Sequence, residues 1–120
     1  MMIDRDNIET ELYTELHGGK GNIEYKDLFE YAHSFGCHIQ IWTLEPGVTE
    51  GNHEHTDDKL DELYYVIEGR AILTSLSGER TLAPGEAAFI SREESHGVRN
   101  DGPALLKLLV IYGKPISIEQ

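Results

Sequence analysis

Two histidines stand one residue apart in the stretch GNHEHTDDKLDELYYVIEG, residues 51–69. On a β-strand, His53 and His55 leave the same face, so both imidazoles can converge on one metal ion. A helical pair would need i, i+4 spacing, so this spacing favours a metal site on a sheet. His96 is the third candidate, because it stands at the head of a short strand that sheet closure can bring opposite the first pair.

A carboxylate would complete this set, and the candidates are Asp57, Asp58, Asp61 and Glu62. Glu62 opens the apolar segment ELYYVIEG, where a strand fixes its backbone, whereas the aspartates lie in the preceding polar turn and suit its solvation. We therefore choose Glu62. Three imidazoles and one carboxylate predict one divalent transition metal per chain, namely Fe, Mn, Ni or Zn, with positions left open for a ligand.

Short strands must position these side chains. From residue 36 onward, apolar segments alternate with Gly, Pro and Asn-containing turns; they are CHIQIWTL, ELYYVIEG, RAILTSLSG, ERTLAPGE, AAFIS, HGVRNDGP and ALLKLLVIYG. Strands repeating at intervals of roughly 8 to 12 residues are typical of an antiparallel sandwich or barrel.

The N-terminal segment is different in pattern. Residues 4–16 place Ile8, Leu12 and Leu16 at helical spacing, which predicts a short helix. The next stretch, HGGKGNIEYKDLF, has a glycine-rich start, but no long apolar helix follows to complete a phosphate site. We interpret it as a turn into an edge strand. The prediction is an N-terminal extension over residues 1–35, packing on the barrel or on a dimer partner, and a barrel over residues 36–120.

Charge and composition exclude several partners. The 120 residues carry a formal net charge of −12, which repels nucleic-acid backbones and anionic membrane surfaces. No segment has the apolar length of a membrane span or a signal-peptide core. Cys37 is the only cysteine and agrees with a reducing compartment, so we expect a cytoplasmic protein.

These spacings resemble the two motifs of the cupin superfamily. The residues at the first motif's positions are Gly47, His53, His55, Glu62 and Gly69, and those at the second are Gly85, His96 and Asn100. The chain departs from the pattern in two places. Six residues separate His55 from Glu62 where the family has three or four, and Ser91 and Glu93 replace a proline and a glycine.

The resemblance implies a small single-domain metal-binding cupin. Its fold would be all-β, a cupin-type double-stranded β-helix (jelly-roll barrel), with an N-terminal extension containing the short helix and edge strand. The resemblance also implies that His53, His55, Glu62 and His96 are the metal ligands, while the motif glycines and Asn100 serve turns and strand ends.

The segment 37–44 presents one of its faces to the barrel interior. By analogy with cupins we place His38, Gln40 and Trp42 in the substrate pocket, and Tyr64 shares the parity of Glu62. The alternative, with His38 and Gln40 in solvent and the apolar face packed inward, remains open. If a proton is transferred, His38 is the first base to test.

We expect a metal-dependent enzyme that acts on a small oxygenated metabolite, as an oxygenase, isomerase, decarboxylase or cyclase. The alternative is a non-catalytic cupin that binds a small ligand or a sugar. A homodimer is expected because the N-terminal forty residues exceed what a barrel needs. We interpret His17 and His33, in that same region, as surface or interface residues.

Overall fold

Strands build most of this protein, whose computed structural model describes residues 1–30 and 33–114. In chain order the elements are β1 (Glu11–Thr14), the 3-10 turn η1 (Leu16–Gly18), β2 (Asn22–Leu28), the 3-10 turn η2 (His33–Phe35), β3 (Cys37–Leu44), β4 (Thr49–His53), β5 (Asp61–Glu68), β6 (Ala71–Ser75), β7 (Gly78–Leu82), β8 (Ala87–Ile90), β9 (His96–Arg99) and β10 (Leu106–Gly113).

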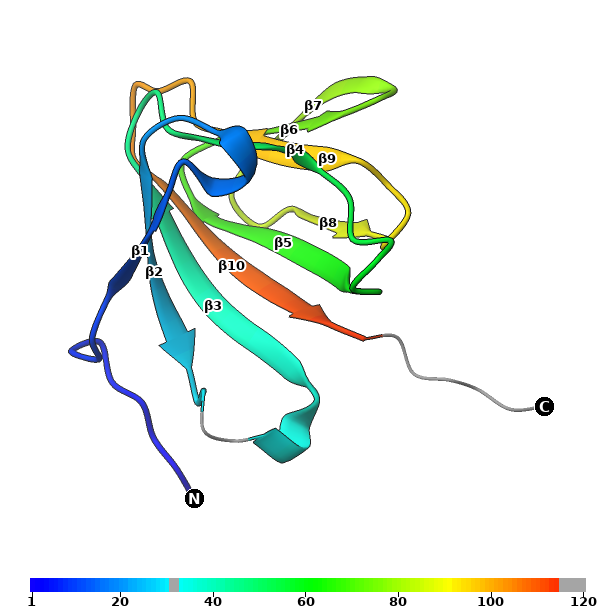
Figure 1. Ribbon diagram of the computed structural model, residues 1–120. Helices are drawn as coiled ribbons and strands as arrows, with labels where there is room; N and C mark the ends of the chain where they lie inside the picture. Colours follow the sequence, from blue (N-terminus) through cyan, green and yellow to red (C-terminus); the bar gives the residue numbers. More distant parts are fainter. Residues whose placement is uncertain (31–32, 115–120) are drawn as a thin grey trace.

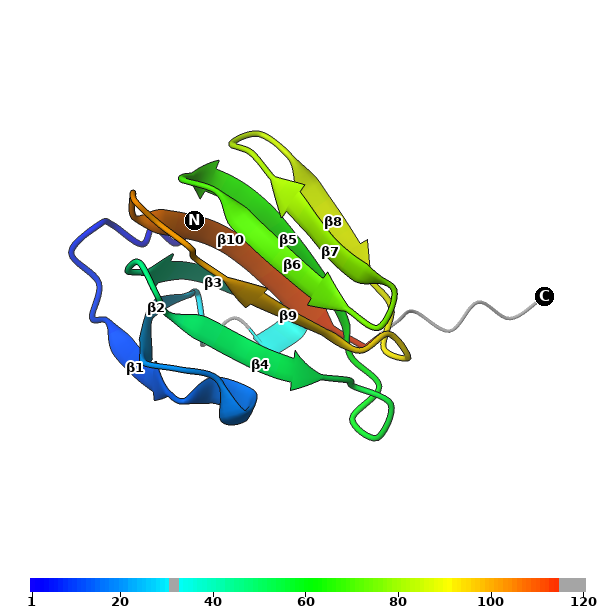
Figure 2. The ribbon, with the colours of Figure 1, turned by 90° about the horizontal axis from the view of Figure 1, so that it is seen from above.

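Within the described residues the strands form two antiparallel sheets that face each other (Figure 1). The larger has the order β1-β2-β3-β10-β5-β8 and the smaller the order β4-β9-β6-β7. Figure 2 shows the smaller sheet lying across the larger one. The all-β jelly-roll barrel expected from the sequence is confirmed.

Alternation along β3 decides which side chains enter the barrel. Gln40, Trp42 and Leu44 are buried, while Ile39 and Ile41 lie on the outer face and are only partly covered. The buried residues of β3, β5 and β10 meet between the sheets in one apolar core. The face of β3 that carries Gln40, Trp42 and Leu44 therefore packs inward, and the face that carries Ile39 and Ile41 packs outward.

The short helix predicted over residues 4–16 is wrong for most of that span. Glu11–Thr14 is strand β1, and the only helical residues nearby form the single turn η1. Tyr13 explains the difference, because its ring stacks on Tyr25 of β2 at 3.9 Å and its hydroxyl donates to Gln40. The predicted edge strand is β2, but β1 covers it and is itself the edge.

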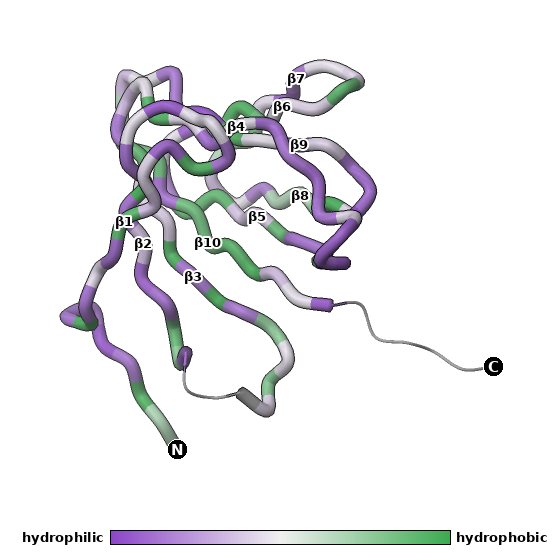
Figure 3. The backbone as a smooth tube through the Cα atoms, viewed as in Figure 1, coloured by the Kyte–Doolittle hydropathy of each residue, from purple (hydrophilic) through white to green (hydrophobic). Residues whose placement is uncertain are grey.

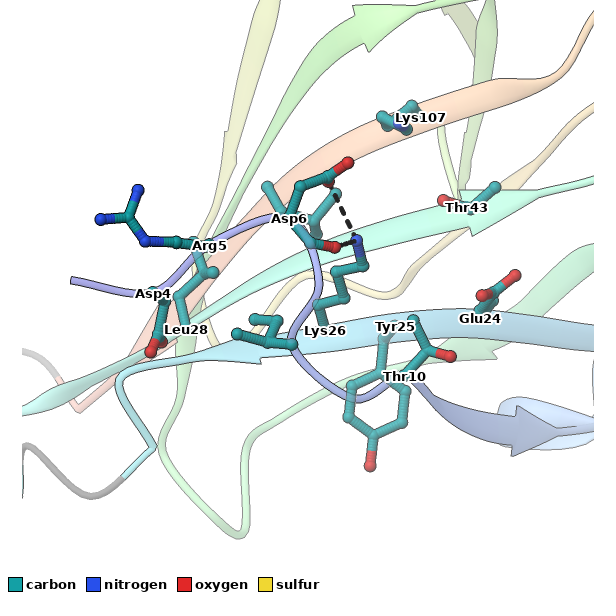
Figure 4. A pocket seen from close by; sticks show the side chains of 12 residues that line it. Asp4, Arg5, Asp6, Thr10, Glu24, Tyr25, Lys26, Leu28, Thr43 and Lys107 are labelled. Atoms are coloured by element: carbon teal, nitrogen blue, oxygen red, sulfur yellow. Dashed lines mark hydrogen bonds and ion pairs between the residues drawn. The ribbon is translucent and has the colours of Figure 1, made fainter.

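The first residues of the chain cross the outer face of the larger sheet. Lys26 Nζ donates to the backbone oxygen of Asp6, and a hollow of about 390 Å³ lies between this segment and strands β2, β3 and β10 (Figure 4). Its lining mixes both charges, including Arg5 and Lys107. No helix among the described residues has the length and apolarity needed to cross a membrane.

Two residues of the cupin-like motifs, Gly69 and Asn100, stabilise the turns that follow strands. Gly69 has a φ of 82°, and a Cβ there would lie 2.2 Å from the Leu105 carbonyl oxygen, so only glycine fits. Asn100 is buried; its side-chain amide donates to the carbonyl of Leu44, and its oxygen accepts from the N–H of Gly102. Both act in turns, as expected.

Candidate metal centre

Three strands bring the four candidate ligands together. His53 ends β4 and is paired directly with His96, the first residue of β9. Glu62 is the second residue of β5, in the opposite sheet, and faces them across the barrel. His55 follows β4 by two residues, where its N–H donates to the Arg92 carbonyl. The departures at residues 91 and 93 leave His96 on its strand.

The donor atoms have the mutual distances expected for ligands of one ion. His53 Nε2 is 3.0 Å from His55 Nε2, and Glu62 Oε1 is 2.8 Å from His96 Nε2 and 3.3 Å from His55 Nε2. Two ligands at right angles, each about 2.1 Å from a metal, are about 3.0 Å apart. This set therefore has the chemistry and the spacing to hold a divalent ion.

Acceptors on the far nitrogens orient two of the rings. Nδ1 of His53 lies 3.0 Å from the Gly51 carbonyl oxygen, and Nδ1 of His96 lies 3.1 Å from that of Glu94. Because a carbonyl oxygen can only accept, each Nδ1 carries a proton, which makes Nε2 of each ring the atom that can bind a metal. Histidines that bind metals are typically held in this way.

The acidic residues near His55 have different hydrogen-bond partners. Asp58 lies 3.0 Å from His55 Nδ1 and orients the third ring, while Asp61 accepts the backbone N–H of Arg92. Glu62 is buried and lies within the cluster. Figure 3 shows the β4–β5 loop, which carries these aspartates, as a hydrophilic stretch beside the open end of the barrel.

The pKa values of the cluster residues depend on their burial and on the charges of their neighbours. Contact with Glu62 raises the pKa of His55 to about 9, with Asp58 contributing further. Burial lowers the pKa of His53 to about 4. Burial alone would raise the pKa of Glu62, but the contacts with His55 and His96 outweigh it and lower the pKa to about 2. Without a metal, the cluster therefore binds a proton at His55.

Two polar residues lie beside the cluster: Glu50, which sequence reasoning missed, and His17, which it interpreted as a surface or interface residue and which is exposed. Glu50 on β4 is buried, accepts the Tyr64 hydroxyl at 2.7 Å, and has Oε2 3.6 Å from His53 Nε2. His17 of η1 stacks on His53 with ring centroids 3.6 Å apart. Burial, together with the charge of Glu62, raises the pKa of Glu50 well above its usual range. Simple alternation would place Glu50 on the opposite face from His53 and His55. A bulge interrupts β4 between residues 50 and 53, so alternation could not reveal that Glu50 lies beside His53.

The residues expected in the pocket lie at different depths. Tyr64 is buried, with its ring 5.9 Å from that of His96, and Trp42 packs edge-on against it. Gln40 is buried and accepts the Trp42 indole N–H. His38 is exposed and stacks on Tyr112, which is paired with Glu62 in the next strand. His38 is therefore exposed near the start of β3, whereas Tyr64 lies beside His96 and Trp42 and Gln40 pack behind Tyr64.

Comparisons with known proteins agree with the fold. No curated protein sequence matches the chain. A Thermotoga maritima protein described as a predicted oxalate decarboxylase has a similar structure, with a TM-score of 0.86, 25% identity, and coverage of 96% of this chain and 100% of that one. A Thermus thermophilus protein gives a TM-score of 0.67 and 30% identity, covering 77% and 83%.

A third structure, a putative sugar phosphate isomerase from Acidithiobacillus ferrooxidans, has a TM-score of 0.66 and 26% identity, covering 78% of this chain and 60% of that one. The family model described as "Cupin domain" matches residues 40–112, which include all four candidate ligands. The chain belongs to the cupin family.

Proposed function

We propose that this cupin binds one divalent transition metal through His53, His55, Glu62 and His96. One observation carries the proposal: three imidazole Nε2 atoms and one carboxylate oxygen converge, with their nearest contacts at 2.8 to 3.3 Å. Nδ1 of His53 and Nδ1 of His96 donate to carbonyl oxygens, which leaves their Nε2 atoms to bind a cation at that point. A cation at the centre satisfies all four groups.

The activity we propose is that of an enzyme acting on a small oxygenated metabolite. An open-coordinated divalent metal polarises a bound carbonyl group and, if it is iron, supports oxygen chemistry. The names of two similar proteins, which mention oxalate decarboxylase and sugar phosphate isomerase, also refer to small oxygenated compounds. Oxygenation, isomerisation or decarboxylation are therefore the candidate reactions.

The protein's own residues would shape the ligand site. Tyr64 and Trp42 form an aromatic wall beside the cluster, and Gln40 fixes the indole by accepting its N–H. His38 is exposed near the start of β3, in the same cross-strand row as Tyr112 and Glu62, where it can exchange protons with solvent. We propose it as the base to test first.

A non-catalytic binding cupin is the second candidate. It is favoured by the hydrogen bonds of Gln40, which also accepts from the Tyr13 hydroxyl and donates to Tyr112. The side-chain amide of Gln40 is therefore bonded to other side chains of the protein, as a structural residue would be, and not presented to a ligand. An exposed His38 would then be a surface residue, and the ligand would bind without turnover.

We also infer a cytoplasmic homodimer. Across strands β3, β10, β5 and β8, two cross-strand rows on the outer face of the larger sheet are apolar, and Lys26 of β2 adjoins the second row at Ile41. The rows are Ile39, Ile111, Leu63 and Phe89, then Ile41, Leu109, Tyr65 and Ala87. Phe89 is 66% exposed. In a chain with a net charge of −12, such an uncharged face is where two copies can meet without repulsion. Cys37 is a free cysteine, which agrees with a reducing compartment.

Elemental analysis should find one equivalent of divalent metal per chain. His53→Ala and His96→Ala should each reduce it below about a tenth of an equivalent, because each removes a ligand. Asp58→Ala is the matched control: it should keep one equivalent and weaken affinity about tenfold, since it only orients His55. Retention of metal by both histidine variants would refute the ligand set.

The metal-free protein should become less stable as the pH rises from about 6.5 to about 9. The pKa of His55 is raised to about 9, so the His55–Glu62 ion pair is complete below about 6.5 and is lost as pH rises through 9. After solvent screening, we expect a loss of about 1–2 kcal/mol in urea unfolding with chelator. His55→Gln should flatten this dependence, and an unchanged slope in that variant would contradict it.

Small hydroxy-carbonyl, enol or phenolic compounds should perturb the optical or magnetic spectrum of the Fe(II) or Ni(II) protein, because two oxygens can chelate the metal. Product analysis of the same mixtures, in air and under nitrogen, separates the enzyme from the binding protein. If a phosphorylated sugar changes the spectrum and no member of the panel does, the proposed substrate class is wrong.

Light scattering should give about 27 kDa, twice the 13.5 kDa of one chain. Tyr65→Glu places a charge within the apolar rows and should yield monomers. Leu76→Glu is its matched control, because Leu76 is 91% exposed but lies outside the larger sheet, next to β6. Equal masses for the two variants would exclude this face as the contact.

A further inference from the structure

The tip of the β1–β2 hairpin is fixed against β4 at the edge of the metal centre, and both ribbon views show η1 beside that strand (Figures 1 and 2). Lys20 and Thr49 exchange backbone hydrogen bonds of 3.1 and 2.9 Å. A Cβ on Gly19 would lie 2.1 Å from the Thr49 carbonyl oxygen, and one on Gly51 would lie 2.0 Å from that of His17. Two glycines therefore allow this close contact.

The contact holds His17 in an unfavourable backbone conformation. His17 has φ 53° and ψ 35°, and Glu15 has φ 49°, both in the left-handed region that side chains other than glycine rarely adopt. Such conformations persist only where the surrounding structure imposes them, and they gather at functional sites. Here the conformation places the His17 ring parallel to that of His53, with 13° between their planes.

Glu50 faces the same space from β4. It is 4% exposed, and Tyr64 fixes one carboxyl oxygen, Oε1. Oε2 lies 3.6 Å from His53 Nε2 and 4.0 Å from His17 Nε2, beyond hydrogen-bond distance of both. A carboxyl group buried at an inward position is costly unless it interacts with polar groups, so packing alone does not account for it.

The donor atoms of His17, Glu50 and His53 all lie within 4.8 Å of one another. His53 Nε2 also belongs to the metal set, so this space adjoins the proposed metal position. A second metal there would need the lone pair of His53 Nε2, which can serve only one ion. The space instead suits an oxygen atom of a molecule bound at the metal, held between an imidazole nitrogen and a carboxyl oxygen.

We propose that His17 Nε2 and Glu50 Oε2 form a hydrogen-bonding subsite for a neutral hydroxyl group of the metal-bound molecule. This inference rests on the proposed metal-binding function and narrows its ligand class. The preferred ligands are hydroxy acids or hydroxy-carbonyl compounds with a further hydroxyl beside the two chelating oxygens. A carboxylate in place of that hydroxyl meets Glu50 and is disfavoured.

The test compares three acids on the Ni(II)-loaded protein by isothermal titration calorimetry. Lactate offers the chelating pair alone, glycerate adds one hydroxyl, and hydroxymalonate adds a second carboxylate. Glycerate should bind about tenfold more tightly than lactate, and hydroxymalonate no more tightly than lactate. His17→Asn, which tolerates the left-handed backbone, should remove the advantage of glycerate and leave lactate affinity and nickel content unchanged.

Glu15→Gln is the matched control, because Glu15 shares the strained turn but does not belong to the group of His17, Glu50 and His53, and it should keep the tenfold preference. Equal affinity for glycerate and lactate in the unsubstituted protein, or binding of neither, overturns the subsite while nickel binding still stands. Two nickel ions per chain, falling to one in His17→Asn, would identify a second metal site instead. If no nickel binds at all, the proposed function itself fails.

Discussion

Lone pairs that point at one another repel, and the metal centre depends on how the fold brings them together. Nδ1 of His53 and Nδ1 of His96 donate to carbonyl oxygens, so their Nε2 atoms face the same point as Nε2 of His55. In the protein without metal, His55 binds a proton and pairs with Glu62, which relieves part of this repulsion. The fold must offset the remainder, and a cation removes it.

The sheets supply this rigidity through their register. His53 and His96 are direct partners on β4 and β9, so their side chains leave neighbouring strands on one face. Glu62 comes from the opposite sheet, where β10 and β8 pair with β5 on both sides. Moving His53, His96 or Glu62 would require one of these ladders to slip, which would turn the strand's inward side chains outward.

Residues whose positions depend on local spacing could be predicted from the sequence. Alternation along β3 places Gln40 and Trp42 on one face, which is a property of a single strand, but the choice of that face as the inward one and the set of four ligands came from the resemblance to cupins. The position of His17 could not be predicted in this way. It depends on a contact between Gly19 and Gly51, and no pattern within residues 4–21 indicates a contact with β4.

The error at the N-terminus has a related cause. Ile8, Leu12 and Leu16 fit a helix in isolation, but Leu12 is 59% exposed, whereas Tyr13 packs on Tyr25 and bonds to the core. A partner strand therefore decided the structure of residues 11–14, and intrinsic periodicity did not.

The distribution of charge in the site also limits what it can bind. Within the described residues, no lysine or arginine forms an ion pair with Glu50 or Glu62. Burial raises the pKa of Glu50, whereas contacts with His55 and His96 lower that of Glu62, so Glu62 contributes a negative charge to the cluster. A divalent ion among neutral imidazoles and Glu62 would leave a single net positive charge. Such a centre matches a ligand with one negative charge, and each further charge would have to be buried without a partner.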